Sequence, residues 1–182
     1  MWVSGSGKST VMREVCMRTD MDIVYVPSYT SRVMRDGERQ WDPYFFVSPD
    51  EFLRLEQEHF FVESMWVHGK AHYGTGYDAL VAPLRDGRYP IKEIDIQGLL
   101  HIQQHKKLTD QYVSFFLHVS DEVMRQRMLH RQPDMPADEL EARCLSAQHE
   151  RLLASRHCDH VLDASQPLEN VVNLLIQYIQ RY

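Results

Sequence analysis

A run of small and polar residues at the start of the chain has the composition of a phosphate-binding loop. Its residues are Ser4, Gly5, Ser6, Gly7, Lys8, Ser9 and Thr10. Glycines let backbone N–H groups approach phosphate oxygens closely, because no Cβ blocks the way. In such a loop Lys8 reaches the β- and γ-phosphates of a nucleoside triphosphate, and the Ser9 hydroxyl holds Mg²⁺. A helix expected over residues 8–18 would direct its positive end at the same anion. We favour this interpretation over a flexible glycine and serine leader.

Composition narrows the class of protein. The chain has 182 residues, which fits one domain with a small insertion, and its 43% hydrophobic and 25% charged residues are typical of a soluble globular protein. The net charge of −6 argues against sequence-independent binding to nucleic acid. Arginine nevertheless far outnumbers lysine, and arginine is the better bidentate partner for phosphate. These features favour small phosphorylated ligands.

Hydrophobic patterns predict strands that alternate with helices. The strands are expected at residues 22–27, 44–47, 60–67, 73–75, 89–96, 113–119 and 160–162. The helices are expected at residues 8–18, from 49, at 77–86 and 98–107, from 121, and at 138–157 and 168–179. Residues 28–43 show no period and are interpreted as a loop. Alternation after a phosphate loop predicts an α/β fold with a parallel sheet flanked by helices. The irregular stretch at 28–89 is interpreted as an inserted subdomain with mixed strands.

A second set of motifs follows in a fixed order. The segment from Ser28 to Glu38 reads Ser-Tyr-Thr-Ser-Arg-Val-Met-Arg-Asp-Gly-Glu. After it come Tyr44-Phe45-Phe46, Phe61-Val62-Glu63, Tyr73-Gly74-Thr75 and Glu93-Ile94-Asp95-Ile96-Gln97-Gly98. In these motifs, over nearly its whole length, the chain resembles the guanylate kinase family. The resemblance implies a P-loop kinase fold, with a core of residues 1–27 and 90–182, a helical lid at about 125–145 and a GMP-binding insertion at 28–89.

The resemblance also implies which residues bind GMP. Those that would bind its phosphate are Arg32, Arg35, Tyr44 and Tyr73, and those that would read its guanine are Ser28, Glu63, Thr75 and Asp95. A carboxylate suits guanine, because it accepts the adjacent N1–H and 2-amino donors, which adenine lacks. Glu93 and Asp95, two apart on an expected strand, would face one side of it, where a Mg²⁺ shell or a nucleotide contact is expected.

Arginines complete the equipment for phosphoryl transfer. Arg127 and Arg131 are four apart on an expected helix, and Arg143 lies on the next one. In the family, arginines at these places flank the lid and neutralise charge on the transferring group. Arg125 is interpreted as a plain surface charge.

The chain departs from the pattern at its N-terminus. A glycine separated by four residues from the Gly-Lys pair is expected, but Trp2 stands there, and residues 1–3 are too few for the strand that should precede the loop. In this fold the first strand lies in the middle of the sheet, so its loss would expose two ladder edges. We therefore expect the chain as printed to look N-terminally truncated, with marginal stability and weak kinase activity or none.

The sequence is best interpreted as a guanylate kinase that converts ATP and GMP to ADP and GDP with Mg²⁺, held by Ser9 and Asp95. One alternative is a non-catalytic guanylate-kinase-like interaction module, and another is a kinase of a different phosphorylated acceptor such as a ribose bisphosphate. Three cysteines without a Cys-x-x-Cys pair suit the cytoplasm. We expect no nucleic-acid or membrane partner and a monomer, although the sequence leaves the oligomeric state and the adenine contacts open.

The first prediction concerns Lys8. Lys8→Ala should lower kcat by several orders of magnitude, because the γ-phosphate loses its fixed cation. GMP binding without ATP, measured by calorimetry, should change little, since other residues form the acceptor site. Loss of GMP binding in a folded variant would contradict the division into two sites.

Overall fold

The computed structural model describes residues 8–18, 20–67, 71–108 and 111–181. The described chain forms two compact units, one of residues 8–18 and 111–181 and the other of residues 20–108. The phosphate-loop residues before Lys8, and the strand expected before them, lie outside the described residues. The proposed insertion at 28–89 falls within the second unit, and its boundaries stay a prediction.

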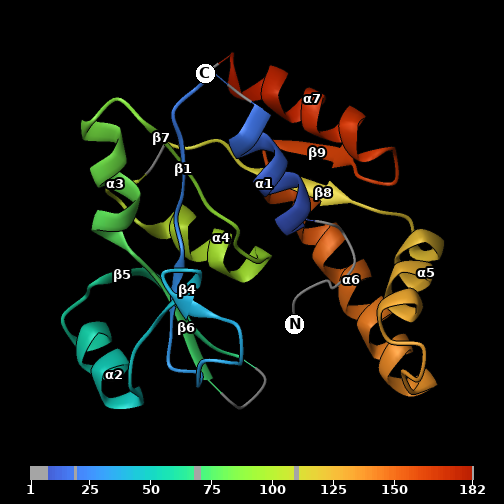
Figure 1. The fold of residues 1–182 in the computed structure, drawn as a ribbon, viewed down its shortest axis with the longest axis horizontal. Helices are drawn as coiled ribbons and strands as arrows, with labels where there is room; N and C mark the ends of the chain where they lie inside the picture. The colour runs from blue at the N-terminus through green and yellow to red at the C-terminus, as the bar shows by residue number, and fades with distance from the viewer. Residues whose placement is uncertain (1–7, 19, 68–70, 109–110, 182) are drawn as a thin grey trace. The chain divides into compact units, whose positions relative to one another are not determined.

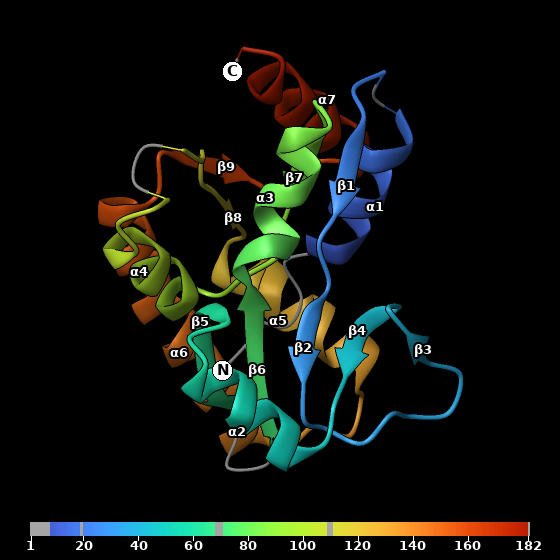
Figure 2. The same ribbon diagram turned by 90° about the vertical axis from the view of Figure 1, so that its left-hand side faces the viewer.

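A five-stranded sheet is the centre of the unit formed by residues 20–108 (Figure 2). Its strands in spatial order are β3 (Arg39–Gln40), β4 (Pro43–Phe46), β2 (Ser28–Thr30), β6 (Ala71–Gly76) and β5 (Phe61–Val67). Strand β2 is parallel to β4 and antiparallel to β6, which also pairs antiparallel with β5. The expectation that residues 28–43 form only a loop is therefore wrong. Strands β2 and β3 are too short to show a period-2 pattern.

A parallel pair of strands and two helices complete this unit. They are β1 (Ile23–Tyr25), β7 (Tyr89–Ile91), α3 (Tyr77–Arg85) and α4 (Ile96–Gln104). Gly87 follows α3 with φ of +72°, a conformation that glycine adopts without strain, so the predicted end of this helix is confirmed. The strand expected at 89–96 is wrong after Ile91. Residues 92–94 belong to no strand, and Asp95 is the N-cap residue of α4 instead.

Helix α2 (Pro49–Gln57) covers part of the sheet with an aromatic stack. Ser48 caps it by accepting a bond from the Glu51 N–H at 3.1 Å, and Pro49 occupies the first turn, as the sequence predicts. Phe52 is fully buried, with its ring stacked 4.5 Å from that of Phe61 and 5.0 Å from that of His72. These contacts join α2 to both β5 and β6 and fix the two strands that carry the site described below.

The unit formed by residues 8–18 and 111–181 has a two-stranded parallel ladder and four helices. Its elements are α1 (Lys8–Arg18), β8 (Phe115–His118), α5 (Asp121–Arg131), α6 (Ala137–His157), β9 (His160–Asp163) and α7 (Leu168–Ile179). Helix α1 packs against α7 (Figure 1), with Val15 and Val172 fully buried. Ser120 caps α5 through the Val123 N–H, as predicted. No described helix in either unit is long and apolar enough to cross a membrane.

The stack around Phe52 generates a stability prediction. Phe52→Ala should lower the free energy of unfolding by about 3–5 kcal/mol, because it removes a large buried ring and leaves a cavity. Leu53→Ala is the matched control on the same helix, since Leu53 is 41% exposed, and it should change stability by less than about 0.5 kcal/mol. Urea unfolding of the whole chain measures both variants. Equal effects would contradict the described packing of α2.

Candidate functional site

A buried carboxylate and a buried hydroxyl face each other across β5 and β6. Glu63 and Thr75 are register partners in this ladder and are only 8% and 0% exposed. The Thr75 hydroxyl donates to Glu63 Oε1 at 2.5 Å. Burial raises the pKa of Glu63, and the bond from Thr75 and the charge of Lys92 oppose that rise. Such a carboxylate is costly to bury, which makes the position a candidate binding site.

The start of α4 lies beside this carboxylate. Asp95 is the N-cap residue of α4, and its Oδ1 accepts a bond from the Gly98 N–H at 2.8 Å. A Cβ on Gly98 would lie 3.4 Å from Glu63 Oε2, so the missing side chain lets the helix approach the glutamate closely. Glu63 and Asp95, predicted to act together, are thus brought together. The prediction that Glu93 and Asp95 share one face of a strand is wrong, because β7 ends at Ile91.

Ser28 is linked to the region of Glu63 by Lys92, which was not among the residues predicted to bind a ligand. The Lys92 ammonium donates to Ser28 Oγ at 2.5 Å and to the Val26 carbonyl at 3.0 Å. Burial lowers the pKa of Lys92 to about 8, although the nearby charges of Glu63 and Glu93 favour its protonated form. Among the residues predicted to read a base, Ser28, Glu63, Thr75 and Asp95 therefore share one neighbourhood within residues 20–108.

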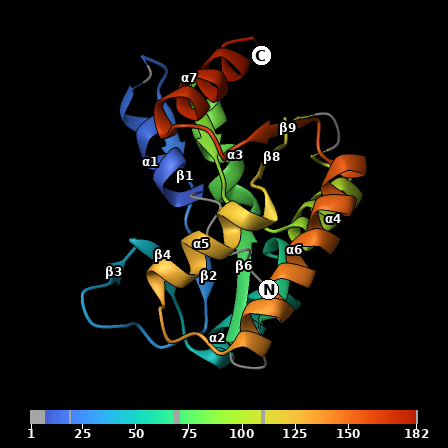
Figure 3. The same ribbon diagram turned by 90° about the vertical axis from the view of Figure 1, so that its right-hand side faces the viewer.

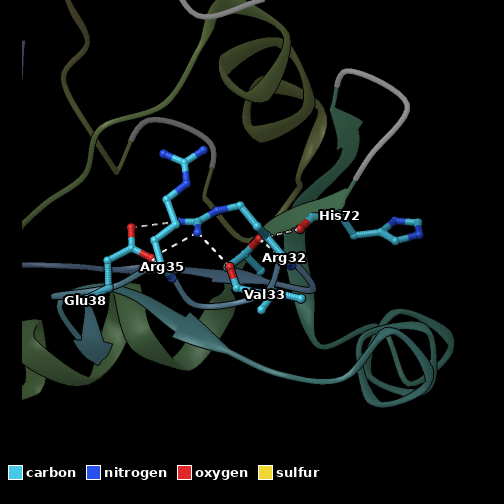
Figure 4. Close-up of polar contacts among 6 residues, drawn as sticks. Arg32, Val33, Arg35, Glu38 and His72 are labelled. Atoms are coloured by element: carbon cyan, nitrogen blue, oxygen red, sulfur yellow. Dashed lines mark hydrogen bonds and ion pairs between the residues drawn. The ribbon is translucent and has the colours of Figure 1, made fainter.

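The residues predicted to bind a phosphate form a second cluster. Arg32 donates from Nη1 and Nη2 to the two carboxylate oxygens of Glu38, each at 2.9 Å, and from Nη1 to the Val33 carbonyl at 2.8 Å (Figure 4). Its guanidinium lies 5.4 Å from the centre of the Tyr44 ring. The bonds to Glu38, and to a smaller extent a bond with Tyr73, raise the pKa of Arg32. The bond from Arg32 holds the pKa of Glu38 below its usual value.

Tyrosines and Arg35 complete this cluster. The Tyr44 and Tyr73 rings meet edge to face with centroids 5.6 Å apart, and burial raises the pKa of Tyr44. The backbone N–H of Arg35 donates to Glu38 at 2.8 Å, while its guanidinium extends away from Glu38 (Figure 4). Arg32, Tyr44 and Tyr73 are thus brought together, and the charged end of Arg35 is not held by the same carboxylate.

In the other unit the predicted arginines lie on α5 and α6, which pack side by side (Figure 3). Arg127 donates to the Ala164 carbonyl at 3.1 Å, and Arg143 pairs with Glu139 on its own helix at 2.5 Å. Arg131 ends α5. Arg125 bridges to Glu141 at 2.6 Å, which agrees with its interpretation as a surface charge. Lys8, Ser9 and Thr10 form the first turn of α1, and Ser4, Gly5, Ser6 and Gly7 lie outside the described residues.

Comparison with known proteins decides the family. The chain matches the family model for guanylate kinase over residues 3–182. The chain belongs to the guanylate kinase family. It is 31% identical over 177 residues to the guanylate kinase of Rhodopirellula baltica, which covers 97% of this chain and 83% of that protein. The guanylate kinase of Geobacter sulfurreducens is 33% identical over 176 residues, covering 95% of this chain and 84% of its own.

A solved structure agrees with these matches. The crystal structure of guanylate kinase from Anaplasma phagocytophilum superimposes with a TM-score of 0.73 at 25% identity, covering 95% of this chain and 80% of that one. The resemblance predicted from the motifs, the α/β kinase fold and the assignment as a phosphotransferase are therefore confirmed. As a member of the guanylate kinase family, the protein is an enzyme that uses nucleotides.

Two residues of this candidate site, Lys92 and Gly98, were not among the residues predicted from the sequence to bind a ligand. Lys92 sits next to a predicted motif, but a lone lysine gave no signal until its neighbours were known. Gly98 belongs to a quoted motif, yet its role as the point where α4 approaches Glu63 depends on the fold. Arg151 also escaped notice, and it joins α6 to α5 by an ion pair with Asp121.

The Glu63–Thr75 pair can be tested directly. Thr75→Val should raise the pKa of Glu63 further, because the ionised carboxylate loses its donor, and should cost about 1.5–3 kcal/mol of stability at neutral pH. Thr75→Ser keeps the hydroxyl and is the matched control, with the pKa of Glu63 unchanged. A titration followed by the carboxyl carbon resonance of Glu63 measures the shift. An unchanged midpoint in Thr75→Val would show that the bond does not act on Glu63.

Proposed function

We propose that this protein transfers the γ-phosphoryl group of ATP to GMP, with ADP and GDP as products. The observation that carries this proposal is the buried Glu63 carboxylate, which the Thr75 hydroxyl and the start of α4 hold beside Ser28 and Lys92. In a chain of the guanylate kinase family, a buried acceptor of this kind has a natural partner in the two adjacent donors of guanine.

The proposed base recognition depends on complementary charge. Oε2 of Glu63 is the oxygen nearer to Gly98, and Oε1 already accepts from Thr75. The carboxylate would accept the N1–H and the 2-amino group of guanine. Adenine has no such pair of donors. Bound adenine would leave the buried carboxylate without hydrogen-bond partners, and that cost in binding free energy would favour guanine. Asp95 and Ser28 would contact the same base from α4 and β2.

Arg32, Arg35, Tyr44 and Tyr73 are proposed to bind the phosphate of GMP. A phosphate dianion would compete with Glu38 for the two guanidinium nitrogens of Arg32, because a phosphate, like a carboxylate, offers two oxygens that can accept from one guanidinium at once. The tyrosine hydroxyls would donate to the remaining phosphate oxygens. Arg35, whose guanidinium is directed away from Glu38, would supply a second cation.

The donor side of the reaction is proposed to use the loop from Ser4 to Thr10. Lys8 would neutralise the β- and γ-phosphates, and Arg127, Arg131 and Arg143 would stabilise charge on the transferring phosphoryl group. Mg²⁺, when bound, would neutralise part of the phosphate charge. Its proposed protein ligands, the Ser9 hydroxyl and the Asp95 carboxylate, are oxygen donors of the kind that Mg²⁺ prefers, and Glu93 lies nearby in sequence.

We also propose a cytoplasmic location, and we propose that the protein acts as a monomer. Cys16, Cys144 and Cys158 are free thiols, which supports a reducing compartment.

Substrate choice tests the proposed function. In a coupled assay with ATP, GMP should be used far better than AMP, CMP or UMP. Glu63→Gln should raise the KM for GMP by about ten-fold or more, because Gln replaces one acceptor oxygen by a donor. Glu58→Gln, an exposed carboxylate at the end of α2, is the matched control and should leave KM unchanged. Equal use of AMP by the wild type would refute guanine recognition, and GMP binding without turnover would favour the interaction module.

A further inference from the structure

The geometry points to Lys92 as a positioning and specificity residue of the guanine site, a role that rests on the proposed function. We propose that its ammonium orients the Ser28 hydroxyl toward the 6-position of the base and balances the charge of the Glu63 carboxylate. The site would then select guanine at two edges, through an acceptor for its N1–H and 2-amino group and through donors for its O6.

The hydrogen bond from Lys92 makes the Ser28 hydroxyl oxygen an acceptor. Lys92 lies in the segment between β7 and α4, and its Nζ donates to Ser28 Oγ on β2 and to the carbonyl of Val26, which precedes β2. An ammonium can only donate, so Ser28 Oγ must accept in this bond and its own proton points elsewhere. In its hydrogen bond with Lys92, Ser28 Oγ accepts. Its own proton is therefore available, within the described part of the chain, to donate to a ligand.

Two of the three ammonium protons are used in these bonds, and the third can reach a ligand acceptor. Guanine carries the acceptor O6 at the position where adenine carries an amino group, and lysine is one of the side chains that pair with O6 and N7 of guanine. Donors from Ser28 and Lys92 therefore favour guanine and repel the amino group of adenine. This discrimination is separate from that of Glu63.

The charges around Lys92 explain why a buried lysine is tolerated there. Glu63 on β5 and the adjacent Glu93 are the acidic groups that favour its protonated form, against burial, which lowers the pKa. Glu63 also faces Asp95, whose charge raises its pKa, and His101 on α4, which lowers it. Lys92 is thus a cation whose charge balances those of Glu63 and Glu93. Without it, the buried Glu63 would tend to take up a proton and stop accepting from guanine.

Substitution of Lys92 tests the inference, because a residue that positions the base should affect KM for GMP and leave kcat nearly unchanged. Lys92→Met keeps an unbranched side chain and removes the charge. It should raise the KM for GMP by about ten-fold or more, since a lost hydrogen bond to a charged group has that effect, with kcat changed by less than about three-fold. The preference for GMP over AMP should fall by a similar factor. Lys106→Met, an exposed lysine beyond α4, is the matched control and should behave like the wild type.

The pH profile supplies a readout that a merely structural role would not move. For the wild type, the KM for GMP should rise above a pH of about 8, because Lys92 loses its proton there. For Lys92→Met, KM should be high throughout and lack this step. Dividing the KM of Lys92→Met by that of the wild type at each pH cancels the ionisations of GMP itself. This ratio should fall toward one as the pH rises, because the wild-type KM increases.

A double-mutant cycle keeps the inference testable if Lys92→Met folds poorly. Ser28→Ala removes the hydroxyl that Lys92 orients, so Lys92→Met should raise KM by a smaller factor in the Ser28→Ala background than in the wild type. Lys92→Arg, which keeps the cation, should retain more of the preference for GMP over AMP. Additive effects in the cycle would overturn the orienting role.

The outcomes separate the inference from the function on which it rests. If the wild type does not phosphorylate GMP, the proposed function fails. If the wild type uses GMP and Lys92→Met matches it in KM, nucleotide preference and pH profile, only the role of Lys92 is refuted.

Discussion

The arrangement around Glu63 depends on keeping a buried carboxylate charged. Burial alone would neutralise such a group, since the charged form loses its hydration. The Thr75 hydroxyl and the Lys92 ammonium act against that loss. Under the proposed function, a carboxylate held in this way would accept the donors of a base without first being reoriented.

The fold supplies this arrangement through short elements that must meet accurately. Strands β5 and β6 place Glu63 opposite Thr75, and the Phe52 stack joins both strands to α2. Helix α4 begins beside the carboxylate, because Gly98 has no side chain to keep it away. The single residues Lys92 and Ser28 then connect the segment before α4 to β2. A displacement of any one element would leave a buried charge without its partner.

A second pairing of charges joins Arg32 and Glu38. There Glu38 satisfies the guanidinium at the edge of the same unit, close to the Tyr44 and Tyr73 rings. The carboxylate holds the guanidinium in a bidentate pair, the same geometry in which arginine binds a phosphate group. The two clusters differ in burial. In the proposed site, Glu63 would discriminate between bases through groups left unpaired, whereas Arg32 would attract the phosphate by charge.

Sequence alone determined the family, the α/β class and most elements, because motifs at fixed spacing and helix caps such as Ser48 and Ser120 are local signals. It also selected Glu63, Thr75 and Ser28 through the resemblance. It failed for β2 and β3, which are too short to show a period, and for Asp95, which caps α4 instead of extending β7. Tertiary structure alone decided that Lys92 meets Ser28 across 64 positions of the chain and that Glu63 lies beside α4. Such contacts depend on how strands and helices pack, and packing joins residues whose separation along the chain carries no pattern.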